Sequence, residues 1–589
     1  MSDQLEQLRG NKKIPFFKIL RRVMSYGKKE WWKFLLAFLL LLCETFLGAV
    51  QPIVVQQFID KLSAANIDLT TVDMIIGFAL MYIGITIVSM LCFFLNNILV
   101  QKAGQRIVYN LRLEVFEHIE NMSQNQFNEM PVGSLVTRVA NYTSSISEMF
   151  TDVLLTILSN TLTVIFVSVI IFTISWKLSL VIYGFAIVVA IYSFIMMNLI
   201  GKLFRKERGY VSDMNSFLSE NLSGMRITQI FSQEEKKEKQ FAEKNKRLAN
   251  AGYMVRVAFT FYRPVYNFLH YICVILVLWL AINNDMKPSI IVAFYLYISR
   301  FFEPIEAIAD SFNQIQRANT DCERLFNLLD VKPEVLDKED AIDVDHFEGR
   351  IEFKNVWFAY EKEDWILKDV SFTIEPKQTV AFVGATGAGK TTILSLIVRN
   401  YEIQKGQILI DGIDITHIKV KSLRKAIGQM LQDVFLFSGT IKSNIALRDD
   451  DFTDEDIQEA CDYVNATSFI SKLPHKLEEE VVERGENFSA GQRQLLSFAR
   501  TVLHKPQILI LDEATANIDT ETEVIIQESL LKMRSIGTML VVAHRLSTIQ
   551  HCDNIIVLSG GEIIEQGTHQ ALLKKKGYYY KLYQLQFEK

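Results

Sequence analysis

The chain has 589 residues, of which half are hydrophobic and 22% are charged. This length exceeds the roughly 100–200 residues of a usual domain, so at least two domains are expected. A mean hydropathy of +0.17 beside so many charges indicates a membrane part joined to a soluble part. The formal net charge of −5 gives no support for a nucleic-acid partner.

The cysteines are far apart in the sequence and form no CxxC pair, which favours buried thiols over a zinc site or a redox couple. They are Cys43, Cys92, Cys273, Cys322, Cys461 and Cys552. No cleavable signal peptide is expected, because the first apolar run follows a basic stretch of about thirty residues and is too long for one.

The N-terminal segment, residues 1–30, is basic and amphipathic. Apolar residues between Phe16 and Met24 are interleaved with Lys18, Arg21 and Arg22. This pattern predicts a helix that lies at the inner membrane surface.

Several long apolar runs follow, and most reach the roughly 20 residues with which a helix crosses about 30 Å of hydrocarbon. The six runs are Trp31–Phe58, Met74–Val100, Val153–Ile174, Leu178–Ile200, Tyr262–Ile282 and Ile290–Phe302. A soluble helical core rarely contains so many runs of this length. We therefore predict an α-helical transmembrane domain with six spans over residues 31–330. The long connections 101–152 and 201–261 should continue the spans as helices, because unstructured loops of that length are uncommon.

The basic residues predict the orientation. They cluster before the first span, whereas the expected outer loops contain only Lys61, Lys177 and Lys287. The N-terminus is therefore predicted to be cytoplasmic, and an even number of spans returns the C-terminal half to the cytoplasm. The predicted location of the protein is the plasma membrane. Glu44 lies within the first apolar run, where either a cavity-facing role or a hydrogen bond between helices would explain it.

A polar linker, residues 331–349, precedes a motif for phosphate binding. The β-rich run 379–383 is followed by Gly384-Ala-Thr-Gly-Ala-Gly-Lys-Thr391 and then a helical pattern. Glycines let backbone N–H groups face the phosphates of ATP, Lys390 reaches the β- and γ-phosphates, and Thr391 can hold Mg²⁺. The predicted loop contacts are Gly384, Ala385, Thr386, Gly387, Ala388, Gly389, Lys390, Thr391 and Thr392.

A second acidic motif follows the apolar run Ile508-Leu-Ile-Leu511. Asp512 is suited to the Mg²⁺ shell, and Glu513 is placed to polarise the attacking water. An acidic pair after a strand is by itself an ordinary strand end. Together with the phosphate loop, it predicts ATP hydrolysis.

Between these motifs, Phe488-Ser-Ala-Gly-Gln492 resembles the signature of ABC transporters. The resemblance implies an α/β P-loop nucleotide-binding domain over residues 350–589. It further implies that Tyr360 stacks on adenine, that Gln432 touches Mg²⁺ and senses the membrane domain, and that His544 contacts the γ-phosphate. The remaining contacts that it implies are Ser489, Ala490, Gly491, Gln492 and Asp519, with Glu483-Arg-Gly485 similar to the X-loop.

The first half is also similar to this family, because six spans before one cassette is the layout of an exporter half-transporter. Gly133–Asn141 resembles the first coupling-helix region, and Glu220–Ile227 resembles the second. Tyr142 departs from this pattern, because the family usually carries Asp after Asn at this position.

In this family, ATP lies between the phosphate loop of one cassette and the signature of the other. The residues on the phosphate-loop side are intact here, but Ala490 replaces the first Gly of the usual LSGGQ, and its Cβ is expected to restrict φ and crowd the γ-phosphate. This combination resembles the catalytically complete (LmrD- or EfrD-like) subunit of heterodimeric bacterial multidrug exporters. A homodimer that tolerates Ala490 is the alternative.

We therefore predict ATP-driven export of drugs or other amphipathic compounds by one half of a dimeric exporter. Its expected partners are a second half-transporter, membrane lipids and amphipathic small molecules. A homodimeric, flippase-like exporter of lipids or peptides is an alternative, and so is an ATP-gated channel or sensor on the same scaffold.

Overall fold

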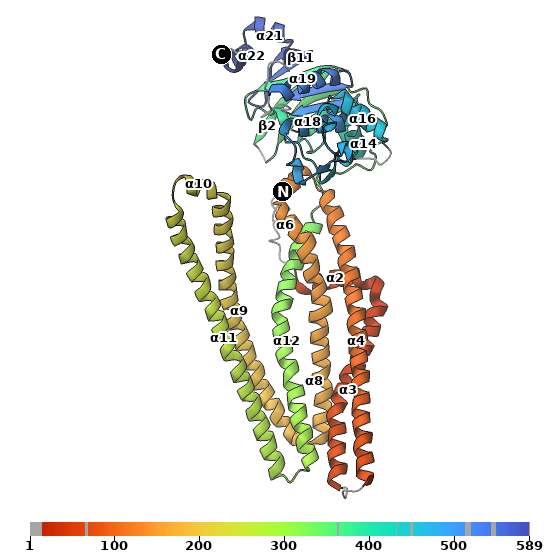
Figure 1. Cartoon of the computed structure of the whole chain (residues 1–589), viewed down its shortest axis with the longest axis vertical. Helices are drawn as coiled ribbons and strands as arrows, with labels where there is room; N and C mark the ends of the chain where they lie inside the picture. The colour runs from red at the N-terminus through yellow and green to blue at the C-terminus, as the bar shows by residue number, and fades with distance from the viewer. Residues whose placement is uncertain are drawn as a thin grey trace. The chain divides into compact units, whose positions relative to one another are not determined.

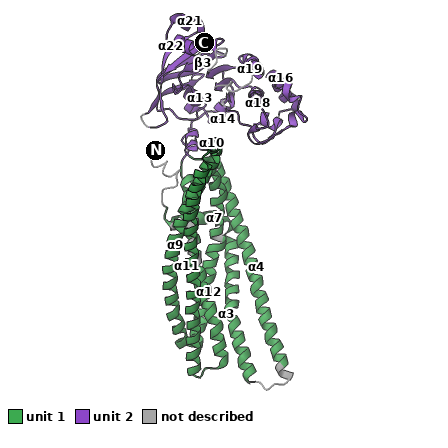
Figure 2. Ribbon diagram, turned by 60° about the vertical axis from the view of Figure 1, so that its left-hand side comes forward, with its two compact units in different colours: residues 1–120, 130–331 green, residues 121–129, 332–589 purple. Residues whose placement is uncertain are grey.

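The computed structural model describes residues 14–64, 69–361, 364–431, 433–447, 452–512, 520–542 and 549–587. The chain forms two compact units, which Figure 2 shows in different colours. The helical unit contains residues 1–120 and 130–331. The nucleotide-binding unit contains residues 121–129 and 332–589.

Long helices make up the helical unit, and each expected apolar run lies in a different one, with Val153 alone falling one residue before α8. The long helices are α2 (Phe16–Gly27), α3 (Trp31–Ala64), α4 (Leu69–Glu120), α8 (Leu154–Ile174), α9 (Trp176–Ser223), α11 (Glu234–Asn283) and α12 (Pro288–Leu329). The short ones are η1 (Lys28–Glu30), α6 (Val132–Thr137), η2 (Arg138–Tyr142), α7 (Thr143–Glu148), η3 (Met149–Val153) and α10 (Met225–Ile230). Within the described residues, five helical stretches are long and apolar enough to cross a membrane. α12 contains the sixth expected run.

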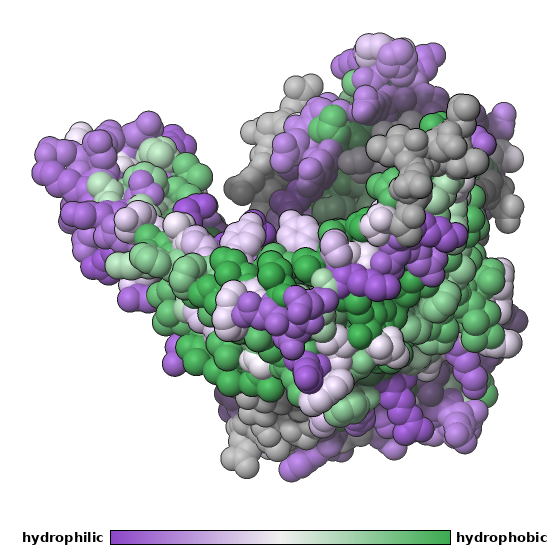
Figure 3. All heavy atoms as spheres, turned by 90° about the horizontal axis from the view of Figure 1, so that it is seen from below, coloured by the Kyte–Doolittle hydropathy of each residue, from purple (hydrophilic) through white to green (hydrophobic). Residues whose placement is uncertain are grey.

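The helices of this unit form two groups. α3, α4, α8 and α12 pack on one another, whereas α9 and α11 run side by side as a long pair (Figure 1). The outward side chains of the bundle are largely hydrophobic (Figure 3). The far part of the α9–α11 pair, called the α9–α11 arm below, is hydrophilic (Figure 3). This distribution fits helices whose lipid-facing stretch continues into water.

A few polar contacts fix helices within the bundle. The Tyr297 hydroxyl of α12 donates to the Ala49 carbonyl of α3 at 2.8 Å, and Arg300 donates to Gln51 Oε1 at 2.5 Å. Tyr142, the departure from the family pattern, accepts a hydrogen bond from Arg324 Nη1 at 2.9 Å. Its hydroxyl thus offers this guanidinium an acceptor without a carboxylate.

The nucleotide-binding unit is built around a six-stranded sheet in the order β12-β11-β3-β10-β9-β6, beside a four-stranded sheet in the order β2-β1-β4-β5. The strands are β1 (Ile351–Ala359), β2 (Trp365–Ile374), β3 (Thr379–Gly384), β4 (Lys405–Ile410), β5 (Ile413–Asp414), β6 (Ile427–Met430), β7 (Gly439–Thr440), β8 (Glu480–Val481), β9 (Ile508–Asp512), β10 (Thr538–Val542), β11 (Asn554–Ser559) and β12 (Glu562–Gly567). The described α-helices are α5 (Gln124–Asn128), α13 (Lys390–Ile397), α14 (Val420–Ala426), α15 (Ile441–Ile445), α16 (Asp454–Tyr463), α17 (Thr467–Ile470), α18 (Ala490–Leu503), α19 (Thr520–Met533), α21 (His569–Lys575) and α22 (Tyr578–Phe587). Three short helical turns are η4 (Ile415–His417), η5 (Lys476–Glu478) and η6 (Glu483–Gly485).

The central strands are parallel and are covered on both faces, which explains their unbroken apolar runs. Successive residues of β3 point into different cores. Val380 and Phe382 pack with the four-stranded sheet and α13, whereas Ala381 and Val383 pack with α16 and α18. The phosphate motif therefore begins at the end of a strand held from both sides.

Candidate active site

The phosphate loop leaves β3 at Gly384 and enters α13 at Lys390. Gly387 and Gly389 adopt φ of +82° and +96°, a left-handed conformation that side-chain-bearing residues rarely adopt. A Cβ at Gly389 would lie 2.6 Å from Leu367 Cδ2. Glycine is therefore needed at this position both for its backbone angle and for the space.

Lys390 is buried, with 7% of its surface exposed, and its Nζ donates to the carbonyls of Gly384 and Ala385 at 2.8 and 3.1 Å. The ammonium group is therefore held against carbonyl oxygens of the phosphate loop, at whose end Lys390 itself lies. No side chain caps the start of α13. Helix starts carry unpaired N–H donors and a partial positive charge, so this loop fits the phosphates of a nucleotide.

The strand register brings the second acidic motif to the same edge of the sheet. Phe382 of β3 pairs with Val542 of β10, which pairs with Asp512 of β9. All three strands run in one direction, so the phosphate loop and Asp512 follow the same strand ends. The exposed Thr391 and the carboxylate of Asp512 supply oxygen ligands of the kind that Mg²⁺ prefers.

Several predicted residues lie outside the described part of the chain. They are Gln432, Glu513, Asp519 and His544. Gln432 follows β6, Glu513 follows β9 and His544 follows β10 in the sequence. These three strands all end at the edge of the sheet described above. Their roles remain predictions.

Tyr360 follows β1 and lies next to the phosphate-loop helix. Its hydroxyl is 3.1 Å from Thr392 Oγ1, and its ring packs edge-on against Phe358 and Tyr401, with centroids 4.9 and 5.1 Å apart. The residue remains 38% exposed. It is therefore held in place beside the loop with a surface open to a planar base.

The signature segment forms the start of α18. Ser489 Oγ accepts from the backbone N–H of Gln492 at 3.2 Å, and Gln492 Oε1 accepts from the Ser489 N–H at 2.9 Å, which completes a capping box. Ala490 is the first helical residue and is not among the residues with positive φ. The expectation that its Cβ restricts φ is therefore wrong, because this position adopts a backbone conformation that any residue can take. Crowding of the γ-phosphate by this Cβ stays a prediction.

The X-loop segment before the signature packs against the chain that follows Gln432. Arg484 and Gly485 have φ of +58° and +67°, and a Cβ at Gly485 would lie 2.7 Å from Leu436 Cδ1. Beyond Leu436, Asn444 bonds both the N–H and the carbonyl of Phe437 at 2.8 Å. Arg500, whose pKa burial lowers to about 10, donates to the Asn444 carbonyl at 2.8 Å. α18 is thereby tied to the segment after Gln432.

Sequence reasoning missed the short helix α5, which belongs to the nucleotide-binding unit. Gln126 Nε2 donates to the Lys332 carbonyl at 2.8 Å, and Asn125 Nδ2 donates to Glu334 Oε2 at 3.2 Å. Asn128 also hydrogen-bonds Tyr401, the neighbour of Tyr360. The residues that resemble the first coupling region, 133–141, lie in the helical unit, and their role stays a prediction. The capping box Ser123-Gln-Asn-Gln126 was the available signal for this helix.

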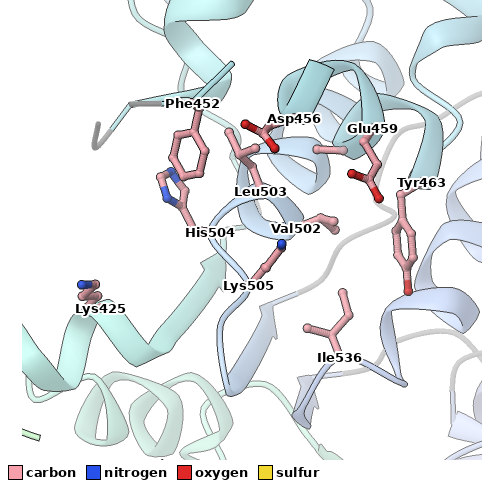
Figure 4. A pocket seen from close by; sticks show the side chains of 11 residues that line it. Lys425, Phe452, Asp456, Glu459, Tyr463, Val502, Leu503, His504, Lys505 and Ile536 are labelled. Atoms are coloured by element: carbon pink, nitrogen blue, oxygen red, sulfur yellow. The ribbon is translucent and has the colours of Figure 1, made fainter. Parts of the chain in front are cut away.

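A separate pocket of about 440 Å³ lies between α16 and the end of α18 (Figure 4). Its lining includes Asp456, Glu459 and Lys505, and none of the predicted nucleotide contacts. It is therefore distinct from the phosphate site.

Together, the phosphate loop, the parallel strand ends and the capped signature helix define a P-loop ATP-binding domain. The family models for the ABC transporter transmembrane region and for the ABC transporter match residues 34–305 and 367–516. The chain therefore belongs to the ABC transporter family, as a membrane-embedded transporter that hydrolyses ATP. This confirms the predicted fold class, a helical transmembrane domain followed by an α/β P-loop domain.

Individual proteins are similar over nearly the whole chain. The probable multidrug resistance ABC transporter ATP-binding/permease protein YheH of Bacillus subtilis is 36% identical, over 86% of this chain and 76% of the relative. The ATP-dependent lipid A-core flippase of Syntrophus aciditrophicus is 32% identical, over 98% and 96%. A solved structure of a bacterial Atm1-family ABC exporter with ATP bound matches with a TM-score of 0.80 and 26% identity, over 96% and 98%.

Proposed function

We propose that this chain is one half of a dimeric exporter that moves drugs or other amphipathic compounds across the plasma membrane. The proposed parts are a cytoplasmic segment 1–30, a membrane domain 31–330, a linker 331–349 and a cytoplasmic ATP-binding domain 350–589. The phosphate loop with Lys390 buried inside it is the observation that carries the ATP-driven part. The relative named for multidrug resistance supports the substrate class.

The tip of the α9–α11 arm supports the dimer. Ile227, Ile230 and Phe231 are 64%, 68% and 68% exposed there, beyond the apolar stretches of both helices. Adjacent apolar side chains exposed outside the lipid-facing zone indicate a protein surface that covers them. The resemblance of Glu220–Ile227 to the second coupling region supports an ATP-binding domain as that surface.

The partner is proposed to be a different chain with a complete signature and an altered catalytic glutamate. Lys390, Thr391 and Asp512 would then face the partner's signature together with Gln432, Glu513 and His544. Mg²⁺, held by Thr391, Gln432 and Asp512, would neutralise phosphate charge. Glu513 would polarise the attacking water, while Ser489–Gln492 would cover a second, weakly active site.

The hydrolysis assignment is tested by Glu513→Gln in the assembled transporter. The ATPase rate should fall by about 10²–10⁴-fold, the usual contribution of a general base, while ATP binding persists. Glu562→Gln, on the exposed side of β12, is the matched control and should keep the wild-type rate. A Glu513→Gln protein with near-normal turnover would contradict the assignment.

The partner and the substrate are tested with the chain reconstituted in vesicles, alone and with a candidate partner subunit. Dye efflux and drug-stimulated ATPase activity should require both chains. Full activity of this chain alone would establish the homodimer. The flippase relative makes lipid export the second candidate. Movement of a labelled phospholipid without dye efflux would favour it, and an ATP-dependent ion current would favour a channel.

A further inference from the structure

An apolar cavity of about 670 Å³ lies in the helical unit, where α2 leads through η1 into α3. Gly27, Lys28 and Trp31 border it on one side. Val100 of α4 and Leu158 of α8 line the other side. Its volume lies within the roughly 300–1,000 Å³ typical of small-molecule sites.

The cavity is a consequence of how α2 packs. α2 lies across the bundle in Figure 1 and packs against α4 and α12. Its own side chains Ile19 and Val23 are fully buried. Arg22 fixes its position, because its Nη1 lies 2.6 Å from Asp330 Oδ1 and its guanidinium lies 4.5 Å from the Phe326 ring. A crosswise helix held in this way leaves the corner between itself and the upright helices unfilled.

The border of the cavity is positively charged. Lys28 lines it, Lys29 follows, and both side chains are exposed. Glu30, the nearest acid in sequence, is engaged by Lys33 at 2.5 Å. The lining of a second apolar cavity of about 430 Å³, between α3 and α4, contains no basic residue, and Lys61 Nζ lies 5.2 Å from the ring of Phe78 in its wall.

The cavity also lies at headgroup depth. Trp31, Val100 and Leu154 stand at one end of the apolar runs of α3, α4 and α8, and all three line it. Tryptophan and lysine at the end of a span occupy the interface between hydrocarbon and water. Basic residues at this level attract anionic lipids.

We propose that this cavity binds one anionic phospholipid, with an acyl chain between α3 and α8 and the headgroup at Lys28. The apolar walls accommodate the chain, and the lysine side chains select a headgroup with net negative charge. The site is independent of the compound that the transporter exports. Lipids of a bilayer contact the whole perimeter of the bundle. A specific lipid site differs from these contacts because it retains one kind of lipid selectively.

The test is native mass spectrometry of the full-length protein in detergent, titrated with phosphatidylglycerol or phosphatidylcholine. Wild-type protein should retain phosphatidylglycerol preferentially. Lys28→Gln should weaken that retention about fivefold, the usual effect of one basic residue near an anionic surface. Lys102→Gln is the charge control and should bind as wild type, because this exposed lysine lies just beyond the apolar run of α4 and is absent from the lining of the cavity.

Filling the cavity tests the acyl-chain part. Leu158→Trp and, independently, Leu35→Trp should reduce retention of both lipids, whereas Ile165→Trp, two turns further along α8 and 50% exposed, should not. Equal retention by wild type and both filling variants would overturn the proposal. So would equal losses in Leu158→Trp and Ile165→Trp, or an equal affinity of wild type for the two lipids.

Discussion

The two units of this protein place their apolar side chains in opposite directions. Every residue of β10 is buried, and the side chains predicted to bind phosphate lie at the ends of such strands. In the helical unit, Ile187 and Phe194 of α9 are 61% and 69% exposed. The nucleotide-binding unit thus positions its site through its own core, whereas the helical unit presents surfaces that lipid or a partner must cover.

This difference predicts where single substitutions act. In the nucleotide-binding unit, backbone angles and strand ends fix the site. Removal of a single side-chain group there should therefore have a large effect on ATP binding or hydrolysis. In the helical unit, long helices share many contacts, so single polar contacts should matter less.

The largest effect is expected from Lys390→Ala. Loss of the ammonium group from the phosphate loop should lower the ATPase rate of the assembled transporter by about 10²-fold or more. Lys472→Ala removes an exposed lysine of the same unit and should keep the wild-type rate. Similar rates for the two variants would show that Lys390 does not contact the reacting phosphates.

Gly389→Ala should disrupt the loop by strain and by a clash. The positive φ costs about 1–3 kcal/mol, and the new Cβ would also meet Leu367. Gly412→Ala is a matched control, since its φ is +81° and its Cβ would meet nothing within 4 Å. Thermal unfolding and ATP titration should show the larger loss in Gly389→Ala; equal losses would mean that φ alone matters.

A smaller effect is expected in the helical unit from Tyr142→Phe. This change removes the acceptor of the Arg324 hydrogen bond but keeps the ring, whose centroid lies 6.0 Å from the guanidinium. An exposed bond of this kind should contribute about 0.5 kcal/mol to the free energy of unfolding. Tyr142→Asp restores the family's carboxylate and should recover the thermal midpoint; a further fall would show that the tyrosine is adapted to this chain.

The smallest effect concerns pH. Burial lowers the pKa of His569, whose Nδ1 is 2.8 Å from the Tyr579 hydroxyl. The folded state therefore favours neutral imidazole, and stability present above the unfolded pKa of about 6.5 is lost as the pH falls below it. The thermal midpoint of wild type should fall more than that of His569→Gln between pH 7.5 and 5.5. Parallel curves would exclude this contribution.

The sequence by itself determined the spans, the order of the domains and the phosphate loop. Long apolar runs have few alternatives to a membrane helix, and a strand, glycine loop and lysine in series encode their geometry locally. Other features depended on contacts distant in the sequence. The Tyr360–Thr392 contact, the place of α5 beside Glu334, and the cavity under α2 each require elements far apart in the chain.

The same distinction explains the correction at the signature. The altered signature residue was recognised from its neighbours, but only the folded helix showed that Ala490 occupies an ordinary helical position, because φ depends on where α18 begins. Local motifs therefore determined the chemistry of this protein, and tertiary packing decided which surfaces its parts present to each other, to lipid and to a partner.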